Sequence, residues 1–110
     1  MDKVKIYDRL AKISEHWSQQ TIAEANGNLF KLAKGQGETK WHRHTDQDEL
    51  FWVLEGELII QLEDRSVTLG RHEMFVVPQG AWHCPVAENE ASFMIVGVNI
   101  TSNAEGGKPN

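Results

Sequence analysis

Near the N-terminus, apolar residues recur at the spacing of one helical face. Ile6, Leu10, Ile13 and Trp17 follow one another at intervals of three or four positions, and charged residues lie between them. This pattern predicts one short amphipathic helix over about residues 4–17. From residue 20 onward the period changes to two, which is the repeat of a β-strand with one buried face.

The remainder of the chain predicts short strands separated by turn residues. Residues 20–26 and 28–34 flank Gly27, and an Asn-Gly-Asn centre favours a hairpin because both residue types tolerate a positive φ. Further strands are predicted at 39–44, 50–54, 57–63, 66–69, 73–77, 82–86 and 92–100. No helical pattern long enough to connect parallel strands lies between them. We therefore expect an all-β antiparallel sandwich or barrel over about residues 20–100, followed by a loose tail at 101–110.

Composition narrows the class of protein. A chain of 110 residues is one domain by size, and 40% apolar with 25% charged residues is ordinary globular composition. Eleven Lys and Arg against sixteen Asp and Glu give a net charge of -5, which disfavours nucleic acid and anionic membrane surfaces as partners. The single cysteine, Cys84, and the absence of a signal peptide or a long apolar run predict a cytoplasmic protein.

Three histidines and one glutamate have the spacing of metal ligands. His42 and His44 lie two apart on one predicted strand, so their side chains share a face with Cα atoms about 6.6 Å apart. Glu49 opens the next strand, and His83 begins a later one. Imidazole and carboxylate together suit Fe(II), Mn(II), Ni(II), Zn(II) or Cu(II), and suit Ca(II) or Mg(II) poorly.

The order of these residues resembles the motifs of the cupin superfamily. The matching residues, in order, are His42-x-His44, Glu49 and Gly56, then Pro78-x-Gly80-x-x-His83. The resemblance covers roughly residues 28–100 and is strongest to small single-domain members that are often labelled mannose-6-phosphate isomerase-like. It implies one cupin domain over residues 1–110, with a double-stranded β-helix, or jelly-roll, barrel. It also implies that His42, His44, Glu49 and His83 bind one divalent transition metal, such as Fe, Mn, Zn or Ni.

The second motif departs from the family pattern at two positions. His72 stands where the family has a glycine, six residues before the proline. Histidine tolerates the left-handed backbone better than most residues, so the turn is expected to survive. Ala87 replaces a terminal asparagine that is not a metal ligand. We hold the two remaining histidines, His16 and His72, to be surface or turn residues.

Strand parity assigns the neighbours of the expected ligands to two faces. Lys40 shares the inward face with His42, and Phe51 shares it with Glu49, so both are candidate pocket residues. Cys84 faces away from the metal and is interpreted as a small buried apolar residue. Three tryptophans also face outward: Trp41, Trp52 and Trp82. So large an apolar surface predicts a covering layer, either the N-terminal helix or, as we favour, a second copy in a homodimer.

Three functions are compatible with these motifs. The first is a metal-dependent isomerase, lyase or dioxygenase acting on a small oxygen-rich molecule such as a sugar derivative or an organic acid. The second is a metal-binding module that holds or senses a small ligand without turnover, and the third is a degenerate scaffold. The complete ligand set argues against the third. Lys40 is the one inward acid or base that the pattern places near the metal. A single candidate of this kind does not decide between the functions, so no catalytic residue is assigned.

Overall fold

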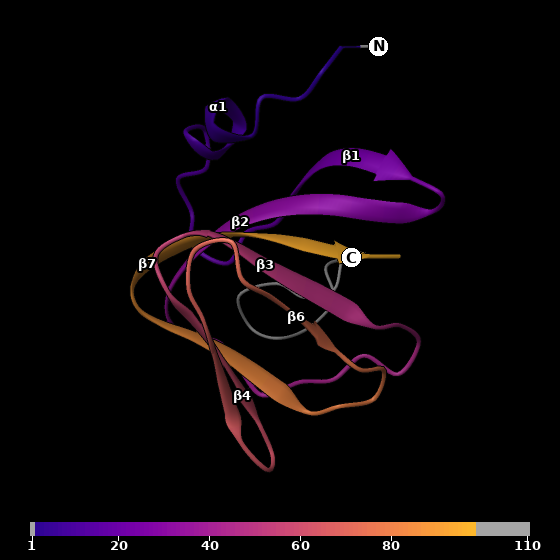
Figure 1. Cartoon of the computed structure of the whole chain (residues 1–110), viewed down its shortest axis with the longest axis vertical. Helices are drawn as coiled ribbons and strands as arrows, with labels where there is room; N and C mark the ends of the chain where they lie inside the picture. The colour runs from indigo at the N-terminus through magenta and orange to yellow at the C-terminus, as the bar shows by residue number, and fades with distance from the viewer. Residues whose placement is uncertain (1, 99–110) are drawn as a thin grey trace.

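The computed structural model describes residues 2–98, which contain one short helix and seven strands (Figure 1). In chain order the elements are α1 (Ile6–Leu10), β1 (Gln20–Ala25), β2 (Asn28–Glu38), β3 (Glu49–Glu55), β4 (Leu58–Leu62), β5 (Ser66–Leu69), β6 (Met74–Val77) and β7 (His83–Gly97). No helix in this part of the chain is long and apolar enough to cross a membrane.

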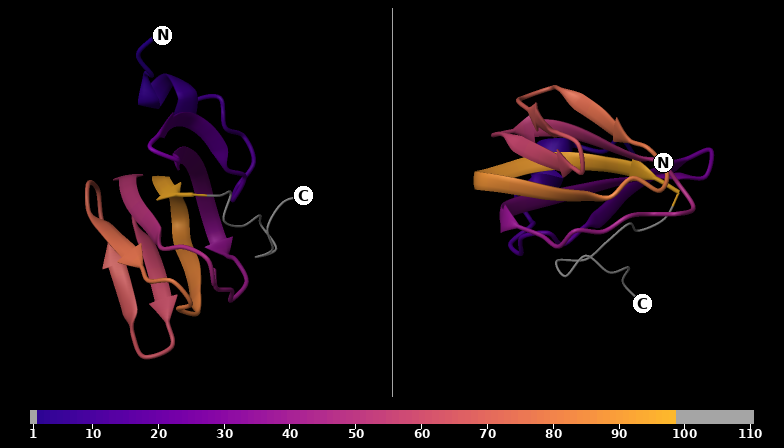
Figure 2. Two further views of the ribbon diagram at one scale, coloured as in Figure 1. Left: turned by 90° about the vertical axis from the view of Figure 1, so that its right-hand side faces the viewer. Right: turned by 90° about the horizontal axis from the view of Figure 1, so that it is seen from below.

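The strands form an antiparallel sheet that curls into a jelly-roll barrel, as the sequence predicts (Figure 2). The main order is β1-β2-β7-β3-β6, while β4 pairs with β5 and with β7. The long strand β7 serves both halves of the barrel. Its second half, around Met94, pairs with β2 and β3, and its first half, around Cys84, pairs with β4.

Two apolar clusters hold the fold together. The interior of the barrel is filled by alternate residues of the strands: Ala33, Phe51, Val53, Leu58, Ile60, Leu69, Val77, Ala87, Ala91, Phe93 and Ile95. The second cluster lies between the N-terminal segment and the outer face of the sheet, where Leu10 and Ile13 pack with Leu32, Leu54 and Met94. The N-terminal segment therefore covers one part of the outer face and leaves the rest uncovered.

The β1–β2 hairpin has the turn that its sequence predicts. Asn26 and Gly27 both have positive φ, 54° and 80°, and Ala25 pairs with Asn28 across the turn. A two-residue loop with positive φ at both positions has the twist that neighbouring strands require.

The helix is much shorter than the predicted 4–17. It ends after Leu10, and no side chain caps its first turn. Farther on, Trp17 has a φ of 64° and donates its backbone N–H to the carbonyl of Lys34 at 2.6 Å. The apolar spacing beyond Leu10 reflects packing rather than a continuous helix, because Ile13 reaches the second cluster from a segment without regular structure.

Two of the strand predictions are also wrong. Residues 39–44 form no strand, and His42 makes only an isolated bridge with His83. The predicted strands 82–86 and 92–100 are not separate, because the single strand β7 runs from His83 to Gly97. Glu88, Asn89 and Glu90 have a turn-like composition but are exposed where β7 passes from one half of the barrel to the other. The predicted strand end at 99–100 and the tail at 101–110 lie outside the described residues.

Candidate metal centre

The four side chains with ligand spacing come together inside the barrel. His42 and His44 come from the segment before β3, Glu49 is the first residue of β3, and His83 is the first residue of β7. All four are buried, and one ligand atom from each lies within 4.8 Å of the others. Two segments about forty residues apart in sequence therefore supply a single cluster.

Backbone pairing aligns two of the histidines. The N–H of His42 donates to the carbonyl of His83 at 3.0 Å, and the N–H of His83 donates back at 2.9 Å. Residues paired in this way across an antiparallel bridge carry their side chains on the same face. The two imidazole centroids are consequently only 4.4 Å apart.

The turn before β7 holds the segment that carries His44. The N–H of Gly80 donates to the carbonyl of His44 at 2.7 Å, and the N–H of Gln79 donates to Oδ1 of Asp48 at 2.8 Å. Gly80 has a φ of 83°, a conformation that glycine adopts without a steric penalty. The second motif thus positions the first motif as well as contributing its own histidine.

Backbone carbonyls orient two imidazole rings. Nδ1–H of His42 donates to the carbonyl of Lys40 at 2.7 Å, and Nδ1–H of His83 donates to the carbonyl of Ala81 at 2.9 Å. With the proton on Nδ1, the lone pair of each neutral ring is on Nε2, which faces the cluster. Hydrogen bonds of this kind fix the tautomer of metal-binding histidines.

The donor set fits a cation. Oε1 of Glu49 lies 3.1 Å from Nε2 of His83, and Oε2 lies 3.5 Å from Nε2 of His44. Nε2 of His42 is buried and has no hydrogen-bond partner among residues 2–98. A buried carboxylate next to imidazole lone pairs is unfavourable unless a proton or a metal ion lies between them. Three imidazoles and one carboxylate are the donors that divalent transition metals prefer.

Burial also favours the form of His42 that binds metal. Removal from water lowers the pKa of His42 below its usual value, and the neighbouring His83 adds to this effect. The hydrogen bond to the carbonyl of Lys40 and the charge of Glu49 act in the opposite direction. A lowered pKa keeps the imidazole neutral near pH 7, as metal ligation requires.

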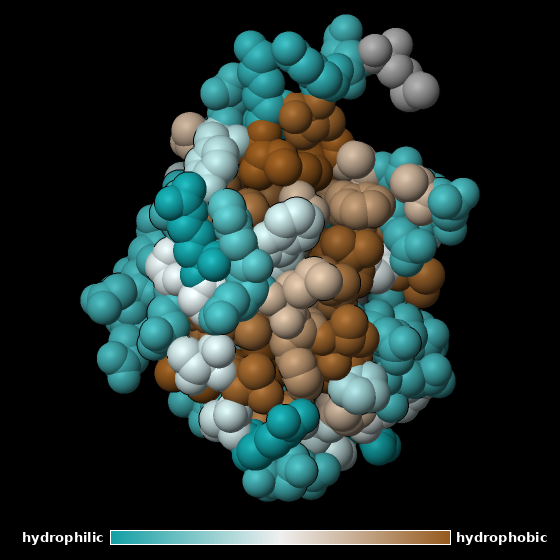
Figure 3. All heavy atoms as spheres, viewed as in Figure 1, coloured by the Kyte–Doolittle hydropathy of each residue, from teal (hydrophilic) through white to brown (hydrophobic). Residues whose placement is uncertain are grey.

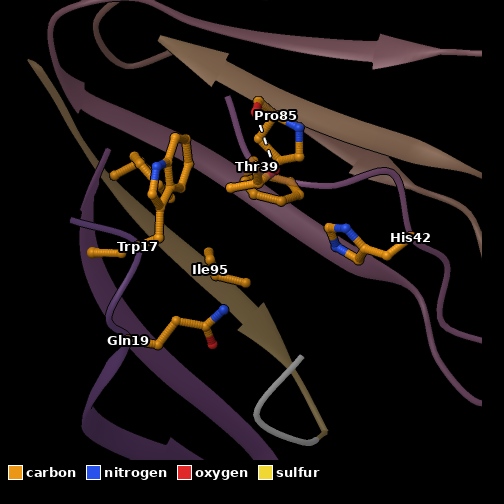
Figure 4. Close-up of a pocket in the computed structure, with 9 residues that line it drawn as sticks. Trp17, Gln19, Thr39, His42, Pro85 and Ile95 are labelled. Carbon is orange, nitrogen blue, oxygen red and sulfur yellow. Dashed lines mark hydrogen bonds between the residues drawn. The ribbon is translucent and has the colours of Figure 1, made fainter. Parts of the chain in front are cut away.

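A narrow cavity lies beside the cluster (Figure 4). It is lined by Trp17, Gln19, Ala33, Thr39, His42, Phe51, Pro85, Phe93 and Ile95. Among these lining residues only His42 has a side chain that titrates near neutral pH. The others offer an apolar wall, one hydroxyl and one amide.

Trp17 closes one side of the cavity. Its ring lies over Gly35, and a Cβ built at that glycine would be 2.6 Å from the ring. The indole N–H donates to the carbonyl of Gln36 at 3.2 Å, and the ring packs on Phe93 with centroids 5.9 Å apart. The absence of a side chain at Gly35 is therefore what admits the tryptophan.

Of the two candidate pocket residues, Phe51 and Lys40, one lines the cavity and the other does not. Phe51 lines the cavity, in agreement with its parity. Lys40 has an exposed side chain and is not among the lining residues, because residues 39–44 do not keep the regular alternation of a strand. Its contribution is the carbonyl that orients His42.

The remaining residues singled out in the sequence lie away from the cluster. Cys84 is buried, donates to the carbonyl of Thr39 at 3.3 Å, and has a thiol pKa that burial raises. His16 is exposed and lies 2.8 Å from Glu90. His72 is exposed in a turn with a φ of 64°, so it adopts the left-handed conformation expected where the family has glycine.

Sequence patterns missed several residues near the site. Trp17, Gln19 and Thr39 line the cavity from segments without regular structure, so no periodicity could place them. Lys31 is different because it lies on a predicted strand, two positions from buried Ala33, and is itself completely buried. The alternation of the strand places Lys31 inside the barrel. A charged side chain is usually expected at the surface, and this expectation hides the signal.

Comparisons with known proteins agree with this fold. A cupin domain model matches residues 28–99. The uncharacterized protein YdbB of Bacillus subtilis is 38% identical over 73 residues, which are 66% of this chain and 65% of that protein. The chain thus matches slightly under two thirds of that relative's length.

Solved structures give the same result. A cupin-2 domain protein from Shewanella frigidimarina is 43% identical, with a TM-score of 0.83 over 84% of this chain and 91% of the other. Protein NMB1881 from Neisseria meningitidis is 31% identical, with a TM-score of 0.80 over 87% and 98% of the two chains. With a domain match over most of its length and two such neighbours, the chain belongs to the cupin family.

Proposed function

We propose that this cupin binds one divalent transition metal ion through His42, His44, Glu49 and His83 and uses it on a small oxygen-rich molecule. A sugar derivative or an organic acid is the proposed substrate class, and isomerase, lyase or dioxygenase chemistry is the proposed reaction. The observation that carries the proposal is the convergence of three imidazoles and a carboxylate, all buried, within 4.8 Å. Buried groups of this kind need a cation to offset their unfavourable proximity.

A bound divalent ion would supply Lewis acidity to an oxygen of the substrate. The residues of the chain have separate tasks around it. The carbonyls of Lys40 and Ala81 hold two of the imidazoles in the orientation that binding requires. Phe51 and Ile95 give the cavity an apolar wall, and the hydroxyl of Thr39 donates to the carbonyl of Pro85 at 3.2 Å at its edge.

Elemental analysis of protein purified without a histidine tag tests the proposal. We expect close to one equivalent of iron, manganese, zinc or nickel per chain, and its loss in His83→Ala. The matched control is His16→Ala, which removes an exposed histidine far from the cluster in sequence and should keep the metal. Absence of metal from the wild-type protein even after reconstitution, or full retention in His83→Ala, would contradict the proposal.

A second function, metal and ligand binding without turnover, is supported by the wall of the cavity. Apart from His42, none of the cavity-lining residues in the described chain provides a general acid or base. Incubating the metal-loaded protein with candidate sugars and organic acids separates the two functions. Ligand-dependent stabilisation without product formation favours binding alone, and product formation favours the enzyme.

We also propose that a second copy of the chain covers the outer face of the sheet. Trp52, Met74 and Val76 are 39%, 62% and 46% exposed, and the strand register places Trp52 opposite Met74. Figure 3 displays apolar side chains gathered down the middle of one face, over the region where Figure 1 places β3 and β6. An apolar area of this kind is typical of an interface.

A further inference from the structure

Among residues 2–98, Lys31 is the largest side chain that is completely buried. It lies on β2 with 0% of its surface exposed. A lysine in the interior is uncommon, because removing an ammonium group from water is costly unless nearby negative charge compensates. Its position therefore calls for an explanation beyond packing.

The strand register directs this side chain toward the site. Lys31 pairs with Ile95 of β7, and Ile95 in turn pairs with Phe51 of β3. Paired residues share a face, and both Ile95 and Phe51 line the cavity beside His42. Ala33, two residues along β2, lines it as well. Lys31 thus shares the inward face of the sheet with these lining residues, although its own side chain does not line the cavity.

Glu49 is close enough to interact with the Lys31 ammonium group. Burial lowers the pKa of Lys31, and the negative charge of Glu49 opposes that change. Glu49 is also the one carboxylate of the four-residue cluster. One acidic side chain therefore faces the proposed metal position and a buried lysine at the same time.

The charges at the site distinguish between classes of ligand. A divalent ion with three neutral imidazoles and one carboxylate leaves one net positive charge, and the Lys31 ammonium adds a second. In a buried site with a low dielectric, this surplus strengthens binding of an anion and gives a neutral ligand no such advantage. A carboxylate is an oxygen ligand that satisfies both the metal and the charge.

We infer that Lys31 is the specificity-determining residue of this site and that it selects an anionic substrate, a carboxylate with a neighbouring hydroxyl or carbonyl oxygen, over a neutral sugar. This inference rests on the proposed metal site and narrows its substrate class. A lysine that only completed the packing of the barrel, or only neutralised Glu49, would not distinguish anionic from neutral ligands.

The test measures ligand affinity at a spectroscopic ion. Wild-type protein, Lys31→Met and Lys34→Met are loaded with Co(II), and visible spectra are followed during titration with azide, glycolate and imidazole. Methionine keeps the unbranched shape of lysine without its charge. Lys34 is the matched control because it lies on the same strand with opposite parity and is partly exposed.

We expect Lys31→Met to weaken azide and glycolate binding by about tenfold or more and to change imidazole binding by less than about threefold. Lys34→Met should change all three affinities by less than about threefold, since exposed charges are screened. Equal loss for anionic and neutral ligands, no loss at all, or failure of glycolate to bind the wild type would overturn the inference.

Failure to bind metal and failure of the variant to fold are interpreted differently from these results. Failure of the wild type to take up Co(II) would overturn the proposed metal function itself, and the Lys31 inference with it. If Lys31→Met does not fold, Lys31→Gln replaces it, because the amide is neutral and keeps hydrogen-bonding capacity. The same ratio of azide to imidazole affinity is then read from that variant, with the same outcomes supporting or overturning the inference.

Discussion

Nε2 of His83 lies 3.1 Å from Oε1 of Glu49 in a part of the barrel that water does not reach. Because Nδ1–H of His83 already donates to the carbonyl of Ala81, a neutral His83 presents a lone pair to the carboxylate. A metal ion held by both groups would remove this unfavourable contact.

Glu49→Gln is expected to lower both stability and metal affinity. The amide can donate to Nε2 of His83, but it leaves the buried Lys31 ammonium without its negative neighbour, so the metal-free variant should unfold at a lower denaturant concentration than wild type. Its affinity for the metal should fall at least about tenfold, since a neutral amide replaces an anionic ligand. Urea unfolding and metal competition measure the two effects, and a variant that binds metal like wild type would exclude Glu49 as a ligand.

The stability of the metal-free protein should decrease as the solution becomes acidic. The pKa of His42 is lowered in the folded protein, so the unfolded chain takes up protons first as pH falls below its ordinary value of 6.5. The contribution of His42 is complete above about pH 6.5 and is lost as the pH falls toward the lower folded value. Urea unfolding of wild type and His42→Asn across pH 5 to 8 measures the slope. An equal slope in both proteins would contradict the assignment to His42.

Metal binding is expected to weaken below about pH 6, because protons compete for the imidazoles. Dialysis at a series of pH values followed by elemental analysis measures the release. Metal content that stays constant down to pH 4 would argue against histidine ligation.

Gly35→Ala should displace Trp17 from the cavity wall. The added methyl group would lie 2.6 Å from the ring, so the ring has to move, at an expected cost of about 1–3 kcal/mol in unfolding free energy. Combining Gly35→Ala with Trp17→Leu is the control, since the smaller side chain removes the overlap. Additive losses in the double variant would show that the two positions do not interact in this way.

His72 should tolerate glycine and reject branched residues. Its φ of 64° lies in the left-handed region, and its side chain is exposed. We expect His72→Gly to keep or raise the unfolding free energy, and His72→Val to lower it by about 1–2 kcal/mol. Thermal unfolding of the two variants makes the comparison, and equal melting temperatures would contradict it.

Trp52→Glu tests the proposed homodimer. Because Trp52 lies opposite Met74 on the exposed outer face, a charge there should dissociate the pair. Light scattering at micromolar concentration is expected to give a dimer mass for wild type and a monomer mass for the variant. A monomer mass for wild type would overturn the homodimer.

Most of the barrel could be predicted from the sequence because its strands alternate regularly and its turns carry strong local signals. The Asn26-Gly27 turn and the inward positions of Phe51 and Val53 follow from such local rules. Positions decided by distant contacts could not be predicted in this way. Trp17 leaves the helical pattern because Gly35 makes room for it, and these two residues are eighteen positions apart.

The residues of the candidate site also divide into those that local patterns predict and those that only distant contacts decide. The spacing of His42, His44 and His83 belongs to local motifs, and the structure brings these residues together with Glu49. The inward position predicted for Lys40 requires an ideal strand, whereas the segment is held by a single bridge. The burial of Lys31 does not follow from local pattern, because burial of a charge depends on a partner, Glu49, that only the folded barrel brings near.

The central position of β7 has a consequence for how the protein is made. Leu29 of β2 pairs with Gly97, so the two strands with the most extensive pairing come from opposite ends of the domain. A ribosome releases the chain from its N-terminus, and β2 must wait for nearly the whole domain to emerge before its main partner arrives. During that interval its apolar residues and unpaired backbone are open to other chains. Nascent chains stalled before residue 83 should therefore depend on chaperones and be prone to aggregation.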